Sequence, residues 1–152
     1  GALHLQKFAD HPLKLKKIFE TTLSLIDEYH PDEMAVEAPF YGKNVQSMLK
    51  LGRAQGVAIA ASLSHNVPFE EYTPRRIKQA ITGNGNASKE QVAAMLKMLL
   101  KFSESPKYFD ATDAMAAAVC HHFQTTGKKQ AENKKSFSGW KSFLAENPGR
   151  KI

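Results

Sequence analysis

The stretch Met34-Ala-Val-Glu37-Ala-Pro-Phe40 organises the interpretation of the whole chain. Its first three residues are apolar without interruption, which is typical of a short strand covered on both faces. Glu37 ends this strand, and Pro39 stops further pairing because proline has no backbone N–H. Carboxylates are seldom buried without a partner, so packing alone explains Glu37 poorly. Glu37 is therefore a candidate functional residue at the end of a central strand.

A second acidic group lies far downstream, in Tyr108-Phe-Asp110-Ala-Thr-Asp113-Ala-Met. This run is predicted to be helical, and a spacing of three residues places both aspartates on one helix face. The spacing is common, so a capping aspartate beside a surface aspartate explains it equally well. The functional hypothesis is that Glu37, Asp110 and Asp113 meet around a divalent metal ion. Mg²⁺ and Mn²⁺ prefer such oxygen ligands, although three acids are few for a two-metal site.

The bulk composition is that of an ordinary globular domain. The chain has 152 residues, of which 42% are hydrophobic and 24% charged, which fits one domain with a full core. No apolar run approaches the length of a membrane span. The single cysteine, Cys120, excludes an internal disulfide and favours a reducing compartment. Its apolar helical neighbours indicate a buried, inert thiol.

The net charge of +6 is unevenly distributed. From Gly127 onward there are 7 Lys/Arg and 2 acids, whereas residues 1–126 hold 14 Lys/Arg and 13 acids. Within that body, Lys43 to Lys89 carries 7 basic residues against 2 acids. A basic strip beside a carboxylate cluster suits a polyanion whose backbone must be held near a metal. For any single lysine, a solvated helix face is the more common explanation.

Helices alternate with strands, which predicts an α/β layered domain over residues 1–126. Capping residues predict where helices begin, namely Asp10, Asn44, Thr73 and Ser88, the last in a capping box with Gln91. A second strand is predicted over Val67–Tyr72. Two helices have predicted inner faces, formed by Val45, Met48, Leu49, Gly52, Gly56, Ile59, Ala60 and Leu63 in one and by Val92, Met95, Leu96 and Leu99 in the other.

Two segments at the ends of the chain carry their own expectations. Gly1–Phe8 alternates weakly, like the end of a strand already in progress, so we expect at least one N-terminal strand to be missing from this chain. Periodicity is lost beyond Thr125, and residues 127–152 are predicted to be a basic, largely disordered tail.

Gly52 and Gly56 indicate either close contact with another helix or subunit, or a backbone pressed on its own sheet.

Phe40 and Tyr41 follow the first strand and precede Lys43, an arrangement that suits stacking on unpaired bases. A hydrophobic plug over the sheet end is the alternative. His121 and His122 are interpreted as structural or surface groups. The sequence has no zinc-ligand spacing, no Ser-His-Asp set and no phosphate-cradling loop.

Five segments in order carry a family resemblance. They are Glu37-Ala-Pro-Phe40-Tyr-Gly-Lys43-Asn44, Leu51-Gly-Arg-Ala-Gln-Gly56, Lys78-Gln-Ala-Ile-Thr-Gly83-Asn-Gly85, Ser88-Lys89-Glu-Gln91-Val92 and Asp110-Ala-Thr-Asp113-Ala. Together they resemble RuvC, the bacterial Holliday-junction resolvase (crossover junction endodeoxyribonuclease) family. The resemblance spans roughly residues 3–125 and does not cover the tail. It implies an RNase H-like fold, with a mixed central sheet flanked by helices.

The resemblance also implies an activity, symmetric nicking of two DNA strands at a four-way junction with Mg²⁺, for which Mn²⁺ is a possible substitute. Glu37, Asp110 and Asp113 fall on the family's catalytic metal-binding acids. The residues expected to bind DNA are Phe40, Tyr41, Lys43, Arg76, Lys78 and Lys89. The expected assembly is a homodimer through the Asn44–His65 helix, working with the RuvAB branch-migration complex in the bacterial cytoplasm, at the nucleoid.

One departure from the family pattern concerns the first catalytic acid, which lies on an opening strand in an Asp-Pro-Gly turn that this chain lacks. Asp10 precedes a helix and is no substitute. We therefore expect the polypeptide as written to be inactive or badly impaired. The competing classes are a non-catalytic nucleic-acid-binding module and another RNase H-like nuclease that acts on RNA–DNA hybrids.

Overall fold

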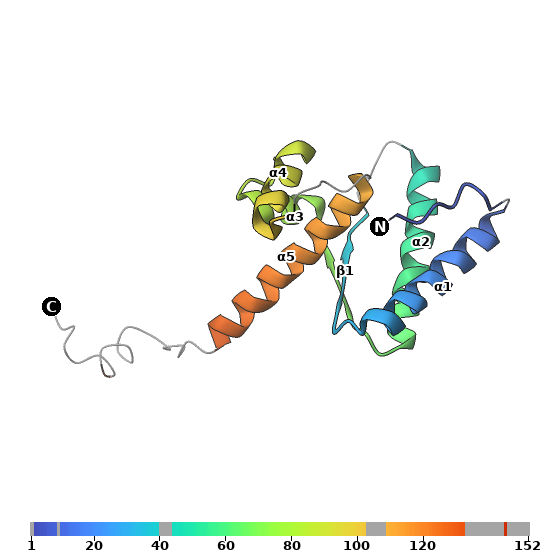
Figure 1. The fold of residues 1–152 in the computed structure, drawn as a ribbon, viewed down its shortest axis with the longest axis horizontal. Coiled ribbons are helices and arrows are strands. Elements are labelled where there is room, and N and C mark those ends of the chain that lie inside the picture. The colour runs from blue at the N-terminus through green and yellow to red at the C-terminus, as the bar shows by residue number, and fades with distance from the viewer. Residues whose placement is uncertain (1, 9, 40–43, 103–108, 133–144, 146–152) are drawn as a thin grey trace. The chain divides into compact units, whose positions relative to one another are not determined.

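The computed structural model describes residues 2–8, 10–39, 44–102, 109–132 and 145. These form five helices and two strands (Figure 1), in the order α1 His11–Tyr29, β1 Met34–Glu37, α2 Val45–Ser64, β2 Phe69–Tyr72, α3 Pro74–Thr82, α4 Lys89–Leu100 and α5 Phe109–Glu132. The chain divides into two compact units, Gly1–His121 and His122–Ile152. The first unit holds all the elements that position the site.

The two strands of the described region pair in parallel, with Met34 opposite Phe69 and Glu37 opposite Tyr72. Parallel strands need a long crossover, and α2 provides it. Both strands therefore end at the same edge, where the Ala38 N–H still donates to the Tyr72 carbonyl at 2.8 Å. The α/β prediction and the strand at Met34 are confirmed.

The helices begin where the sequence places caps. Asp10 accepts from the Leu13 N–H at 2.8 Å, and Asn44 accepts from the Ser47 N–H at 3.1 Å. Thr73 caps α3, whose first residue is Pro74, and Ser88 and Gln91 form a full capping box before α4. These bonds satisfy backbone N–H groups that a helix cannot pair internally.

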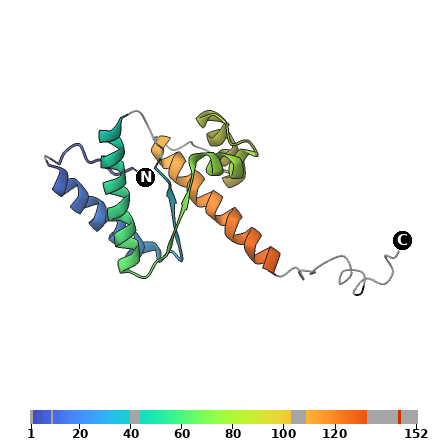
Figure 2. The same ribbon diagram turned by 180° about the vertical axis from the view of Figure 1, so that it is seen from behind.

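Two groups of helices bury the apolar side chains. The larger core joins α3, α4 and α5, through Ile77, Ile81, Ala87, Val92, Leu96, Ala116, Ala117 and Cys120, and Ala35 and Tyr72 of the strands pack against it. On the other side, α1 lies beside α2 in both views (Figures 1 and 2). Cys120 is fully buried, as predicted.

Two expectations about inward-facing side chains are wrong, and one helix is longer than the loss of periodicity suggests. Leu99 is 43% exposed, because the shared core reaches only as far as Leu96 along α4. The helix bearing Asp110 and Asp113 continues past Thr125 to Glu132, since lysine, glutamine and alanine favour helix without an apolar stripe. The face of α2 expected to point inward is largely exposed, with Val45 at 61% and Leu49 at 55%.

The two glycines of α2, Gly52 and Gly56, lie on the same exposed face of the helix. A Cβ added at Gly52 or Gly56 would meet no atom of the described residues within 4 Å. The idea that these glycines let the backbone press on its own sheet is therefore wrong, and contact with a second chain stays a prediction.

In the second unit, α5 runs on from His122 to Glu132. The rings of His122 and Phe123 contact each other there with centroids 6.0 Å apart. Most of the predicted tail lies outside the described residues. Among the described helices, none is both long enough and apolar enough to cross a membrane.

Replacing Leu96 with alanine should lower the free energy of unfolding by about 2–5 kcal/mol, because its side chain is fully buried. The matched change Leu99→Ala, one turn away, should cost about 1 kcal/mol or less, since Leu99 is half exposed. Urea unfolding followed by circular dichroism measures both. Equal losses for the two variants would contradict the described core.

Candidate functional site

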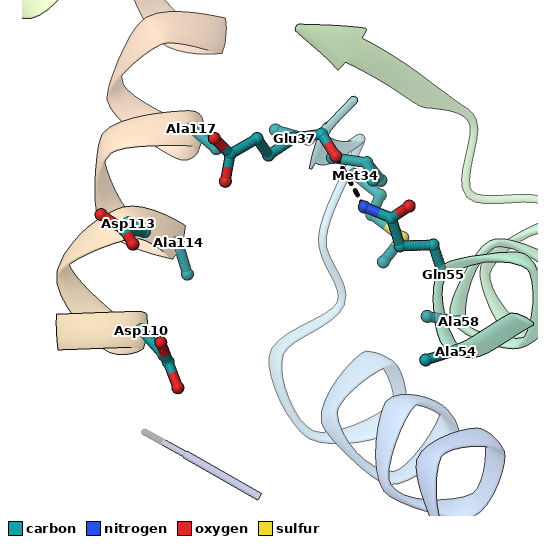
Figure 3. Close-up of a pocket in the computed structure, with 11 residues that line it drawn as sticks. Met34, Glu37, Ala54, Gln55, Ala58, Asp110, Asp113, Ala114 and Ala117 are labelled. Carbon is teal, nitrogen blue, oxygen red and sulfur yellow. Dashed lines mark hydrogen bonds between the residues drawn. The ribbon is translucent and has the colours of Figure 1, made fainter. Parts of the chain in front are cut away.

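Glu37 is held at the end of β1 by both neighbouring elements. Its strand pairs with β2, and its backbone carbonyl accepts a hydrogen bond from Gln55 Nε2 of α2 at 2.6 Å (Figure 3). The crossover helix thus returns to fix the strand from which it departs. The Glu37 side chain is left to reach toward α5.

Asp110 and Asp113 come from the first turns of α5 and lie along one side of it (Figure 3). Between them, Ala111 and Thr112 are buried, which fixes the rotation of the helix. Negative charge near a helix N-terminus is favoured by the backbone dipoles. The helix N-terminus therefore stabilises both aspartates in their charged form, even where a carboxylate has no positively charged partner of its own.

The three acids line one pocket of about 410 Å³, as the sequence hypothesis required. Its walls are the strand β1, the α2 residues Ala54, Gln55 and Ala58, and the α5 residues Ala114 and Ala117. These small side chains leave open space between the strand and the two helices, and the carboxylates are the charged groups on its wall. The structure thus brings Glu37, Asp110 and Asp113 together.

The charges in this region act on one another. Partial loss of solvent raises the pKa of Glu37, and the negative charge of Asp113 raises it further. The positive charges of Lys89 and Lys78 act in the opposite direction. Glu37 and Asp113 therefore lie close enough to repel, and the two lysines offset part of that repulsion.

Lys89 makes the most direct contact with the acids. Its Nζ lies 3.0 Å from Asp113 Oδ2, and this hydrogen bond and ion pair raise the pKa of Lys89. Glu37 and Asp110 raise the Lys89 pKa as well. One ammonium group thus interacts with all three carboxylates.

A second, adjoining pocket of about 310 Å³ joins the lysines to the acids. Glu37, Asp113, Lys78 and Lys89 all line it, over an apolar floor that includes Ile77 and Val92. Because α3 starts directly after β2 and α4 packs on α3, both lysines reach the edge where the strands end. The structure therefore places Lys78 and Lys89, two of the residues expected to bind DNA, in one pocket with Glu37 and Asp113.

The donor set suits a divalent ion by chemistry, since all three groups are carboxylates. No group of three His, Cys, Asp or Glu side chains in the described residues is yet close enough to hold a metal ion. Lys89 occupies one oxygen of Asp113 at this edge. The acids share a pocket without forming a closed set of ligands.

The structure does not bring Arg76 to this pocket. Its backbone carbonyl lies 4.0 Å from Cys120 Sγ, and its charge lowers the pKa of Tyr72 and of Cys120 against other effects that raise them. Two residues along a helix turn the side chain about 200°, so Arg76 and Lys78 face opposite ways. Phe40, Tyr41 and Lys43 lie outside the described residues.

Two contacts of the site were missed from the sequence. The first is the Gln55 bond, for which the sequence signal is an amide flanked by the small residues Ala54 and Gly56. The other contact is a chain in which His121 bonds Tyr72 Oη at 2.8 Å and Glu33 at 2.9 Å. It ties α5 to the end of β2, and it confirms the structural role expected for His121.

Comparison with known proteins gives consistent matches. The family model described as crossover junction endodeoxyribonuclease RuvC matches residues 3–121. The RuvC protein of Cytophaga hutchinsonii is 62% identical over 99% of this chain and 72% of its own length. That of Christiangramia forsetii is 64% identical over 96% of this chain and 74% of its own length.

Solved structures agree with this result. Thermus thermophilus RuvC superposes with a TM-score of 0.76 at 28% identity, covering 83% of this chain and 76% of that one. The same protein in complex with a Holliday junction substrate gives 0.76 at 30% identity, over 81% and 78% of the two chains.

The α/β fold and a strand edge that carries acids and lysines define an RNase H-like nuclease, a hydrolase that cuts phosphodiester bonds. Nucleases of this kind depend in general on divalent metal. The chain belongs to the RuvC family of crossover junction endodeoxyribonucleases.

Removing the two lysines should raise the pKa of Glu37 further, because both lower it in the intact protein. The variant Lys78→Gln/Lys89→Gln should therefore titrate Glu37 at higher pH, whereas Asp113→Asn should move the pKa down. Carboxyl-carbon NMR of Glu37 measures each shift. Lys97→Gln, on the same helix as Lys89, is the control and should leave the value unchanged; a downward shift in the double variant would contradict the described charges.

Proposed function

We propose that this protein resolves Holliday junctions by nicking two strands of a four-way DNA junction symmetrically. The observation that carries the proposal is the meeting of Glu37, Asp110 and Asp113 with Lys78 and Lys89 at one strand edge. Membership of the RuvC family and the fold shared with a protein solved on junction DNA support it.

In this proposal the residues have separate tasks. Glu37, Asp110 and Asp113 would hold divalent metal, Mg²⁺ in the first place with Mn²⁺ as a substitute. When bound, the metal supplies charge neutralisation on the phosphate and a lower pKa for the attacking water. Lys78 and Lys89 would hold the scissile phosphate against the acids, and Lys89 would exchange its bond with Asp113 for a phosphate oxygen.

The remaining predicted contacts complete the proposal. Phe40 and Tyr41 would stack on bases unpaired at the crossover, and Lys43 and Arg76 would contact backbone phosphate. The cut would leave a 5′-phosphate. We also propose that the protein works with the RuvAB branch-migration complex at the bacterial nucleoid.

A homodimer through the Asn44–His65 helix is part of the same proposal, because symmetric nicking needs two sites. Support comes from the exposed apolar side chains of Val45, Leu49 and Leu63, which share one face of α2 with the open space at Gly52 and Gly56. Such a row of apolar and small residues suits close packing of two helices.

The first test is cleavage of a synthetic mobile four-way junction with Mg²⁺, beside plain duplex DNA. In a chain that also carries the family's opening strand and its acid, we expect nicks at the junction alone, and a fall of about 100-fold or more in rate for Asp113→Asn, because a metal-holding carboxylate contributes several kcal/mol to charge stabilisation. The polypeptide as written should bind the junction and cut it weakly or not at all. Junction binding by this variant should persist. Equal cutting by wild type and Asp113→Asn would refute the assigned acids.

The same assay separates the rival functions. A non-catalytic binding module would hold the junction without a metal-dependent cut in any variant. A nuclease for RNA–DNA hybrids would cut the hybrid and leave the junction intact.

Replacing Leu49 with lysine should weaken dimerisation by about tenfold or more, since burial of a leucine contributes about 1.5–3 kcal/mol. Analytical ultracentrifugation over a concentration series measures the dissociation constant. The control is Leu25→Lys, on α1, where the leucine is 49% exposed. A dimer equally stable in both variants would place the interface elsewhere.

A further inference from the structure

A third cavity, of about 430 Å³, lies between α1 and α2 and takes no part in the proposed nuclease site. Its charged lining comes from Lys14 of α1 and from Lys50 and Arg53 of α2, with the ring of His11 beside them. The rest of the described wall is apolar and comes from Leu5, Leu15, Ile18 and Ala54, and none of the described lining residues is acidic.

The positive charges in this cavity lack acidic partners. Among the described residues, the ion pairs are Lys16–Glu20, His65–Asp27, Lys89–Asp113 and His121–Glu33, so Lys14, Lys50 and Arg53 are in none of them. Like charges gathered around a hollow repel each other unless an anion enters. By comparison, Lys89 at the nuclease site has Asp113 as its counter-charge.

An unsatisfied polar atom lies at the same place. In the described part of the chain, His11 Nε2 is the buried side-chain nitrogen or oxygen that has no hydrogen-bond partner. Buried polar atoms are nearly always bonded, so an orphan indicates a place for a water, an ion or a ligand group. Because His11 also lines the cavity, an oxyanion that reached its ring would accept a hydrogen bond from this nitrogen.

We infer that the cavity between α1 and α2 binds a phosphate group, through Lys14, Lys50 and Arg53 with a hydrogen bond from His11. Arginine and lysine together suit phosphate, because the guanidinium donates in a fork and the ammonium adds a point charge. The phosphate is either a phosphodiester of bound DNA or a free phosphate ion.

The position of the cavity favours a phosphodiester. Ala54 lines this cavity and also the pocket of the three acids. Lys50, Arg53 and Ala54 are spaced i, i+3 and i+4, so they lie next to each other on α2. In its DNA form the inference rests on the proposed function, and the cavity would then hold the backbone of the strand or arm beside the cut.

The test compares two variants of equal charge change. One is Lys14→Gln/Lys50→Gln/Arg53→Gln, and the control is Lys16→Gln/Lys97→Gln/Lys101→Gln, which touches no lining residue. Binding of a fluorescent four-way junction is measured between 50 and 200 mM salt. Each lost phosphate contact should reduce the slope of log affinity against log salt by about one.

We expect the cavity variant to lose about one to two units of slope and about tenfold or more in affinity, with nick positions unchanged. The control should keep the wild-type slope. Equal weakening by the two variants would mean that only net charge matters for junction binding, and would overturn the DNA form of the inference. Thermal unfolding checks that both variants fold, and Arg53→Gln alone replaces the triple variant if that one does not.

A second arm identifies the source of the phosphate and does not depend on the nuclease. The NMR signals of the His11 ring are followed as inorganic phosphate is added to the wild type and to the cavity variant. A shift in the wild type alone, without a difference in junction binding, assigns the cavity to free phosphate. A difference in junction binding assigns it to DNA, and the absence of both refutes it. If the wild type fails to bind junctions at all, the proposed function fails while this arm still decides the cavity.

Discussion

The parallel pairing of β1 with β2 is the constraint on which the site depends. Because both strands run the same way, Glu37 and Tyr72 end at one edge. The chain that leaves β2 enters α3 directly, so Lys78 starts from the same edge as the carboxylate. An antiparallel pair would place these groups at opposite ends. The hydrogen bond from Gln55 to the Glu37 carbonyl reinforces this arrangement from the crossover helix.

The charges at this edge are mutually dependent. Glu37 and Asp113 repel each other, which raises the pKa of Glu37, and Lys89 relieves the repulsion by its bond to Asp113. A polyanion brought to the edge would add negative charge to acids that already repel. In the proposed function cations would therefore be needed there, with the lysines supplying part of the positive charge and a divalent metal ion the rest. The same argument explains why the acids in this structure share a pocket without closing on one point.

Much of this could be predicted from local sequence. A carboxylate that follows an apolar strand marks Glu37 as a candidate functional residue. The spacing of one helical turn from Asp110 does the same for Asp113. The helix starts followed from Asp10, Asn44 and Ser88, whose bonds span only three residues. What could not be predicted depends on distant contacts. The Gln55 bond crosses 18 residues, and the Lys89–Asp113 pair crosses 24. Helical periodicity also predicts which side chains share a face, such as Leu99 with Leu96 or Val45 with Leu49. It does not predict whether another element covers that face.

The helix α2 connects these observations, because each part of its surface has a different role. Gln55 and Ala54 face the acids, Lys50 and Arg53 face the basic cavity, and Val45 and Leu49 are exposed. A helix repeats its direction every 3.6 residues, so a single one can carry these three surfaces. The sequence of α2 is therefore under three separate constraints.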